Sequence, residues 1–97
     1  MENVIYYNDL YDLYNQLLTN KQCNYFEDYY FHNLSFSEMA ENYGVSRNAV
    51  FKQVHSVVHK LEEYEKKLEL LSKRKQLFEI SSHISDLELK NKIQNII

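Results

Sequence analysis

The sequence predicts an all-α protein of four to five helices, with a helix-turn-helix followed by a long C-terminal helical extension. The 97 residues include one glycine and no proline, so the tight turns of a β-sandwich or barrel lack their usual residues. Apolar residues recur three and four positions apart. Ser or Thr followed three positions later by Glu or Gln indicates helix starts. We expect one domain over residues 1–80 and an appended helix over 81–97.

The first predicted helix covers the N-terminal part of the chain. Its apolar face consists of Tyr6, Leu10, Leu13, Tyr14, Leu17 and Leu18. Thr19 and Gln22 then form the pattern of a capping box, in which each side chain hydrogen-bonds the backbone amide of the other residue. A second helix should therefore begin there, with Cys23, Phe26 and Tyr30 on its apolar face.

A helix-turn-helix is predicted after the second helix. Ser35 and Glu38 form another capping box, which starts a short helix. Gly44, the only glycine, follows this helix at the point where a left-handed backbone is needed for a sharp turn. Ser46 has the position of an N-cap for the next helix. Two helices joined in this way can place the second of them in the major groove of DNA.

The helix that starts from 46 is predicted to be long. Its apolar residues follow a heptad spacing and are Val50, Val54, Val57, Leu61, Tyr64, Leu68 and Leu71. No residue before Ile80 is expected to break the helix. The part from Tyr64 to Phe78 is longer than a core of this size requires. Either the first helix folds back over it or a second copy covers it, and we favour a homodimer.

A weaker final helix is predicted at the C-terminal end. Ser81 or Ser82 offers a cap for it. Its apolar positions are Ile84, Leu87, Ile93 and Ile96 or Ile97. We expect this helix to serve in dimerisation or to pack against the preceding one.

The composition argues against several classes of function. The single Cys23 excludes a disulfide framework and fits a cytoplasmic protein, and no apolar run is long enough for a membrane span. The sequence has no glycine-rich phosphate loop and no nucleophile elbow, so we expect no enzyme, no catalytic residues and no cofactor. His55 and His59 share a helix face, but no third ligand accompanies them, and no metal site is expected.

The charge is distributed unevenly along the chain. The net charge is −3, but residues 1–45 carry −6 and residues 46–97 carry +3. Residues 46–60 contain two His and three Lys or Arg residues and no acidic residue. This segment is either a local cationic binding face or a solvated helix face that the following glutamates balance.

The candidate DNA-binding residues lie at the start of the predicted recognition helix. They are Ser46, Arg47, Asn48, Phe51, Lys52 and His55. Arg and Asn side chains form paired hydrogen bonds with guanine and adenine, respectively. Lys52 and Lys60 are expected to contact phosphates. Phe51 is suited to a thymine methyl or to a protein partner, and a protein-binding or merely solvated face remains the alternative.

The helix-turn-helix segment resembles region 4 of bacterial sigma factors. The resemblance extends over 17–61 and includes a Leu-Thr start. Its main motifs are Leu-Ser-x-x-Glu-x-Ala-Glu from Leu34 and Gly-Val-Ser-Arg from Gly44. The chain departs from the sigma pattern at Phe51, where a basic or amide side chain is common, and in the mixed charge after Lys60.

Over 6–78 the chain resembles more specifically the YlxM family. The motifs include the Tyr29-Tyr30 pair, Ser-Arg-x-Ala-Val from Ser46, and Leu-Glu-x-Tyr-Glu-x-Lys-Leu over 61–68. YlxM proteins are small sigma-region-4-like proteins of bacteria such as the low-GC Gram-positives, and they are encoded beside genes of the signal recognition particle. The resemblance implies a link to that pathway.

Together these observations predict a non-enzymatic regulatory protein that binds double-stranded DNA. The first alternative is an accessory factor that contacts the RNA or protein of the signal recognition particle through the same face without binding DNA. The second alternative is a purely structural dimer.

Overall fold

The structure is a computed structural model that describes residues 3–97, and it is all-helical over that range. The elements are α1 (Val4–Tyr14), the 3₁₀ turn η1 (Asn15–Leu17), α2 (Asn20–Tyr30), α3 (Phe36–Tyr43), α4 (Arg47–Leu68), α5 (Leu70–Ser82) and α6 (Leu87–Ile96). The predicted fold class is confirmed, although the described residues form six α-helices instead of four to five. No helix in this part of the chain is long and apolar enough to cross a membrane.

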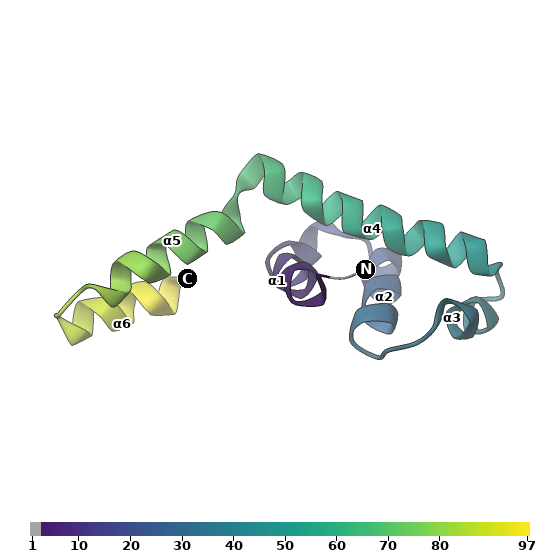
Figure 1. The fold of residues 1–97 in the computed structure, drawn as a ribbon, viewed down its shortest axis with the longest axis horizontal. Coiled ribbons are helices and arrows are strands. Elements are labelled where there is room, and N and C mark those ends of the chain that lie inside the picture. Colours follow the sequence, from purple (N-terminus) through teal and green to yellow (C-terminus); the bar gives the residue numbers. More distant parts are fainter. Residues whose placement is uncertain (1–2) are drawn as a thin grey trace.

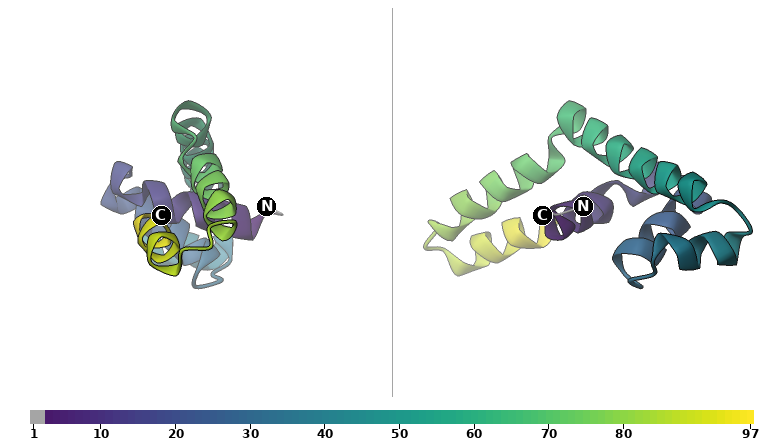
Figure 2. Two further views of the ribbon diagram at one scale, coloured as in Figure 1. Left: turned by 90° about the vertical axis from the view of Figure 1, so that its left-hand side faces the viewer. Right: turned by 45° about the vertical axis from the view of Figure 1, so that its right-hand side comes forward.

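The helices form a body and a projecting hairpin. The long helix α4 lies across α1, α2 and α3, and α5 continues from its C-terminal end away from the body (Figure 1). The last helix, α6, turns back alongside α5 (Figure 2). The molecule is therefore elongated, with extents of 55 × 25 × 24 Å.

The core lies in the body and is rich in aromatic side chains. Phe26 is fully buried and stacks on Tyr11 with ring centroids 4.3 Å apart, and on Tyr30 at 4.5 Å. The phenol of Tyr11 donates a hydrogen bond to Glu27, which satisfies its polar end. The inward face of α4 closes this core with Val50, Val54, Val57, Val58 and Leu61.

The predicted starts of α2, α3 and α4 are confirmed. Both capping boxes form, at Thr19 with Gln22 and at Ser35 with Glu38. The Ser46 hydroxyl accepts a hydrogen bond from the third amide of α4, as an N-cap does. These local patterns fix three helix starts in the body.

The predicted continuous helix over 46–80 is wrong, because the chain divides at Glu69. Glu69 has a left-handed backbone, with φ 55°, and it separates α4 from α5. The carboxylate of Glu65 accepts hydrogen bonds from two amides of the first turn of α5, and the hydroxyl of Tyr14 accepts a third. The amides belong to Leu70, Leu71 and Ser72. The new helix start is thus capped by side chains outside α5, which offsets the cost of the break.

The first helix covers part of the seam, as one of the two predicted alternatives required. The Tyr64 hydroxyl donates to the carbonyl of Leu17 at 3.2 Å, and the ring of Tyr64 lies 5.8 Å from that of Tyr14. Beyond this point, Leu68 and Phe78 are 44% and 56% exposed. Leu71 is buried, so the C-terminal part of the predicted seam is only partly covered within the described chain.

The cap of the last helix differs from the prediction. Asp86, and neither Ser81 nor Ser82, caps α6 by accepting a hydrogen bond from the Leu89 amide. Ser81 is fully buried inside the hairpin, where it donates to a carbonyl of its own helix and accepts from Gln94 of α6. Ser81 is therefore still helical, in the last turn of α5.

Candidate nucleic-acid interface

The helix-turn-helix lies at the end of the molecule opposite the hairpin, where α3 leads into α4 (Figure 1). Gly44 ends α3 with φ 67°, the left-handed conformation that the sequence predicts. The backbone amides of Gly44 and Val45 donate hydrogen bonds to carbonyls in the last turn of α3. The turn brings the first residues of α4 to the surface.

The structure brings the six predicted residues together on one exposed surface. Arg47, Phe51 and His55 follow one another at a spacing of four, which places them on the same side of α4. Asn48 and Lys52 form the adjacent row, and all six residues, Ser46 included, are exposed. The opposite side of this helix is buried in the core. We call this surface the recognition face: Ser46, Arg47, Asn48, Phe51, Lys52 and His55.

An aromatic cluster supports the recognition face. The ring of Phe51 meets that of Phe36 edge-on at 5.7 Å, and the His55 ring lies 4.0 Å from it. Phe36 in turn stacks on Tyr29 at 4.6 Å. The Arg47 guanidinium carbon lies 5.8 Å from the Phe36 centroid, within the range of a cation–π contact. Phe51 and Arg47 are thereby held in place while Phe51 stays 42% exposed.

Phe36 and Tyr29 pack beneath the recognition face, and the sequence analysis does not place them there. They are 15 to 22 residues from Phe51 in the sequence, so no local spacing connects them. The sequence offers one indication of this cluster, which is that an aromatic residue, Phe36, directly follows the Ser35 cap at the start of α3.

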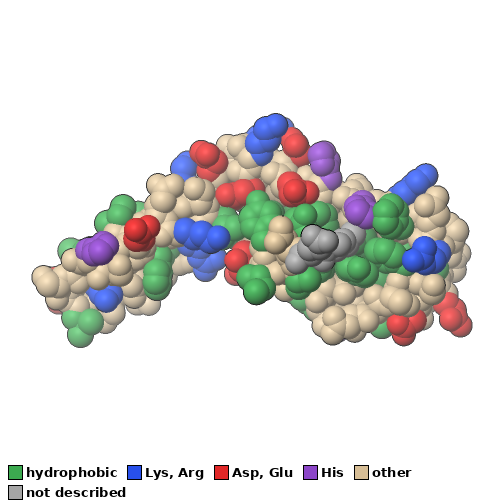
Figure 3. All heavy atoms as spheres, viewed as in Figure 1, with side chains coloured by type: hydrophobic (Ala, Val, Ile, Leu, Met, Phe, Trp, Pro, Cys, Tyr) green, Lys and Arg blue, Asp and Glu red, His purple; other side chains and the backbone are tan. Residues whose placement is uncertain are grey.

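The electrostatics of the recognition face favour an anion. The first turn of α4 carries no acidic residue, so the positive end of the helix dipole is not neutralised there. Both ion pairs among the described residues, Arg74 with Asp12 and Lys92 with Glu88, lie in other parts of the molecule. Lys or Arg side chains are visible at this end in Figure 3, with acidic side chains along its lower edge. The cationic area is therefore small and bounded.

The two histidines of α4 do not form a recognisable metal centre. His55 and His59 are both exposed. Within residues 3–97 no group of three or more His, Cys, Asp or Glu side chains could hold a metal ion.

Comparison with known proteins decides the family. A model described as "Putative helix-turn-helix protein, YlxM / p13 like", the UPF0122 family, matches residues 1–97. The chain belongs to the UPF0122 family. The resemblance to YlxM proteins that the sequence analysis rests on is therefore confirmed, and the family match extends through the C-terminal hairpin.

Three UPF0122 proteins illustrate the similarity. One from Ureaplasma urealyticum serovar 10 is 42% identical over 87 residues, which is 90% of this chain and 88% of the relative. One from Shouchella clausii is 45% identical over 73 residues, or 75% of this chain and 67% of the relative. One from Staphylococcus aureus strain JH9 is 49% identical over 63 residues, or 65% and 57%.

Proposed function

We propose that this UPF0122 protein is a DNA-binding regulatory protein that docks the recognition face in the major groove of duplex DNA. The observation that carries the proposal is the exposure of all six residues at the N-terminal end of α4, on a helix-turn-helix whose other side is buried. A recognition helix of this motif contacts base edges with its N-terminal residues while the preceding helix crosses the backbone.

Each side chain of the face has a chemical role in this arrangement. Arg47 suits the paired acceptors O6 and N7 of guanine, and Asn48 suits the acceptor and donor of adenine. Lys52, and Lys60 further along α4, suit phosphate oxygens, which set the register without specifying sequence. The uncompensated N-terminus of α4 adds a site for a phosphate, with the Ser46 hydroxyl beside it.

The test is a fluorescence titration of labelled nucleic acids. Duplex DNA from the protein's own operon is compared with a random duplex and with signal recognition particle RNA, at low and moderate salt. We expect preference for the operon duplex and an affinity that falls steeply with salt, because released counterions drive phosphate binding. Arg47→Ala should weaken operon binding by about 1–3 kcal/mol, while Lys52→Ala should weaken all duplexes alike.

Lys73→Ala provides the matched control. Lys73 is an exposed cation on α5, outside the recognition face, so its loss leaves the local contacts of that face intact. If Arg47→Ala and Lys52→Ala bind the operon duplex as tightly as Lys73→Ala does, the recognition face is not the DNA-binding surface.

The aromatic cluster favours one further candidate, an accessory factor of the signal recognition particle. Phe51 is 42% exposed, with His55 against its ring, whereas DNA-binding sigma regions commonly have a basic or amide side chain there. An exposed ring suits an unpaired base or an apolar side chain of a protein. Tighter binding to the particle RNA than to either duplex would favour this function over DNA regulation.

We also infer that the protein acts as a homodimer in the cytoplasm. Dimeric helix-turn-helix proteins present two recognition helices to two half-sites of DNA. The apolar residues of the C-terminal hairpin that remain exposed support a second copy.

A further inference from the structure

Most apolar side chains of the hairpin of α5 and α6 are exposed. No residue of α6 is buried, and α5 buries only Leu71 and Ser81. The exposed apolar side chains are 43–85% accessible and are Leu70, Leu77, Phe78, Ile80, Leu87, Leu89 and Ile96. Helices of 13 and 10 residues are too short to be stable in water on their own. The hairpin helices pack against each other, and α5 also contacts α1, but these contacts leave the seven side chains open to a partner.

An open groove of about 770 Å³ lies between this hairpin and α1. The hollow between the hairpin and the body is visible in Figure 3. Asp9 and Asp12 of α1 line one wall, and Leu71, Phe78 and Ile97 line the hairpin side. The hairpin side also carries Arg74, Lys75 and Glu79, so the acidic wall faces a side of mixed apolar and charged residues.

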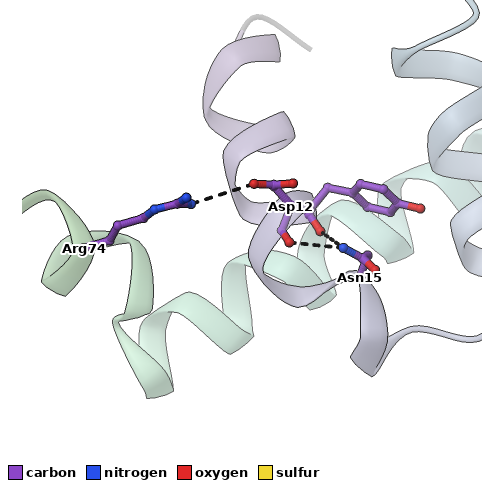
Figure 4. A network of polar contacts seen from close by, with 4 residues as sticks. Asp12, Asn15 and Arg74 are labelled. Carbon is purple, nitrogen blue, oxygen red and sulfur yellow. Dashed lines mark hydrogen bonds and ion pairs between the residues drawn. The ribbon is translucent and has the colours of Figure 1, made fainter. Parts of the chain in front are cut away.

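An ion pair spans the groove. Arg74 of α5 reaches Asp12 of α1 at 3.8 Å, and the Asn15 side chain bonds back to the carbonyls of Asp12 and Tyr11 (Figure 4). Asp9, by contrast, forms no ion pair in the described part of the chain. The acidic wall therefore keeps a carboxylate for a cation from outside.

The outer side of α6 carries side chains that can pack against the apolar residues of the groove and pair with its carboxylates. Leu89, Lys92 and Ile96 are spaced three and four apart, which places them on one side of α6, and all three are exposed. The other side faces α5, where Gln94 donates a hydrogen bond to Ser81 at 3.1 Å. The two aliphatic side chains match Leu71, Phe78 and Ile97 of the groove, and the lysine between them matches the carboxylates of α1.

We propose that a second copy of this chain fills the groove, with the outer side of α6 from each copy inserted into the groove of the other. The arrangement is two-fold symmetric, so the same two surfaces are covered in both copies at once. It deepens the homodimer part of the proposed function and does not depend on DNA binding.

The charge of α6 supports a second copy of the same chain as the occupant. The inserted helix α6, residues 87–96, carries two basic residues and one acidic residue, whereas residues 3–18 carry two acidic residues and no basic one. Lys92 pairs in its own helix only with Glu88, at 3.3 Å, and both side chains are at least 70% exposed. Such a surface pair is weak, so Lys92 can turn to Asp9 of the partner subunit.

Sedimentation equilibrium of the full chain tests the proposal. The wild type should have about twice the monomer mass of 11.8 kDa at micromolar concentration. Ile96→Asp and Phe78→Asp should each raise the dissociation constant of the dimer by about 30-fold or more, as loss of an interface hot spot does. Both residues are exposed within one copy, at 85% and 56%, so the variants should keep their helical circular dichroism.

Ile5→Asp is the matched control, because Ile5 is an aliphatic residue of α1, 80% exposed and outside the groove lining. It should remain dimeric. The proposal would be overturned if the wild type stayed at 11.8 kDa up to a protein concentration of about 100 micromolar. It would also be overturned if Ile96→Asp were as dimeric as Ile5→Asp.

A charge exchange between copies distinguishes reciprocal insertion from another dimer. Lys92→Glu and Asp9→Lys should each self-associate more weakly than wild type, because each homodimer then places like charges together. An equimolar mixture of the two variants should form a heterodimer that is tighter than either homodimer. One of its two contacts is the wild-type pair of Lys92 with Asp9, and the other has opposite charges in reversed order. No gain on mixing means that Lys92 and Asp9 do not meet across the interface. Since none of these measurements involves DNA, failure here and failure of the DNA-binding proposal are separate results.

Discussion

Gly44 shows how one residue determines the direction of the recognition helix. Its φ of 67° lies in the left-handed region, and a Cβ added there would meet no heavy atom within 4 Å. The position therefore requires glycine for its backbone conformation and not for space.

Gly44→Ala should consequently destabilise the fold without disturbing its packing. We expect a loss of about 1–2 kcal/mol in the free energy of unfolding, the cost of a left-handed conformation for a residue with a Cβ. Urea unfolding followed by circular dichroism measures it. Ser37→Ala, at an exposed position within α3, serves as the reference, and an equal stability of the two variants would mean that the turn can relax into another conformation.

Phe51 gives a second prediction, which rests on the proposed binding to duplex DNA. Its ring is fixed between Phe36 and His55 and is suited to contact with the C5 methyl group of a thymine. Replacing that thymine by deoxyuridine removes only the methyl group and should weaken wild-type binding about fourfold, from about 0.8 kcal/mol of apolar contact.

The matched variant for this prediction is Phe51→Ala. It should bind the thymine and deoxyuridine duplexes equally, because it has no ring to contact the methyl group. Testing each thymine of a bound operon duplex in turn by competition titration measures the effect. A wild-type protein indifferent to every replacement would show that Phe51 does not read thymine.

At the level of elements, the joint between α4 and α5 depends on Glu65. Burial raises the pKa of its carboxyl, but the hydrogen bonds accepted from Tyr14 and from the Leu71 and Ser72 amides outweigh burial, and the pKa is lowered overall. Burial and the hydrogen bond to Glu65 also raise the pKa of Tyr14 to about 12. Both groups are therefore stabilised in the forms that the joint needs, a carboxylate and a neutral phenol.

The lowered pKa of Glu65 predicts that the joint weakens in acid. Because the folded-state pKa lies below the unfolded value of about 4.3, this contribution to stability is present above that value and is lost as the pH falls through the folded-state pKa. Glu65→Gln should be less stable than wild type at pH 7 and should lose less stability between pH 5 and pH 3. Urea unfolding at a series of pH values measures both.

Tyr14→Phe separates the hydrogen bonds of the joint from its charge. This change removes the donor to Glu65 and the acceptor for the Leu70 amide while the buried ring remains. We expect it to cost about 1–2 kcal/mol at pH 7. If wild type and Glu65→Gln have parallel stability profiles in acid, then Glu65 does not hold the joint through its charge.

The joint between α4 and α5 shows which helix starts can be predicted from sequence and which cannot. The capping boxes at Thr19 and Ser35 could be predicted because both partners of each lie within four residues. The start of α5 could not, because its caps come from Glu65 inside the preceding helix and from Tyr14, 56 positions before Leu70. Glu69 has no local signal for a left-handed backbone, and the heptad spacing continues across it.

The candidate site follows the same division. The spacing of residues 47–55 alone predicts which side of α4 is exposed, and the structure agrees on every one of those candidates. Spacing says nothing of the rings from α2 and α3 that hold Phe51 and Arg47, since those contacts depend on how three helices cross.

The whole molecule is more extended than its length requires. The radius of gyration is 16.9 Å over Cα atoms, whereas a compact domain of this length has about 12.5 Å. The difference arises because the hairpin projects from one end of the body while the recognition face lies at the other (Figure 1). The proposed dimer surface and the proposed DNA surface are thus separated along a 55 Å axis, and each can be altered without touching the other.

This separation leads to a last prediction, which rests on both the DNA-binding and the reciprocal-dimer proposals. If two copies joined through their hairpins hold two recognition faces on one duplex, the second contact is intramolecular and gains from a high effective concentration. Ile96→Asp should then bind a two-half-site duplex, selected with the wild-type protein, about 100-fold or more weakly. It should bind an isolated half-site as tightly as wild type does, since α4 is unchanged. Equal binding of wild type and Ile96→Asp to the full site would show that one copy is sufficient for recognition, whereas equal losses on the full site and the half-site would show that the hairpin supports the recognition face itself.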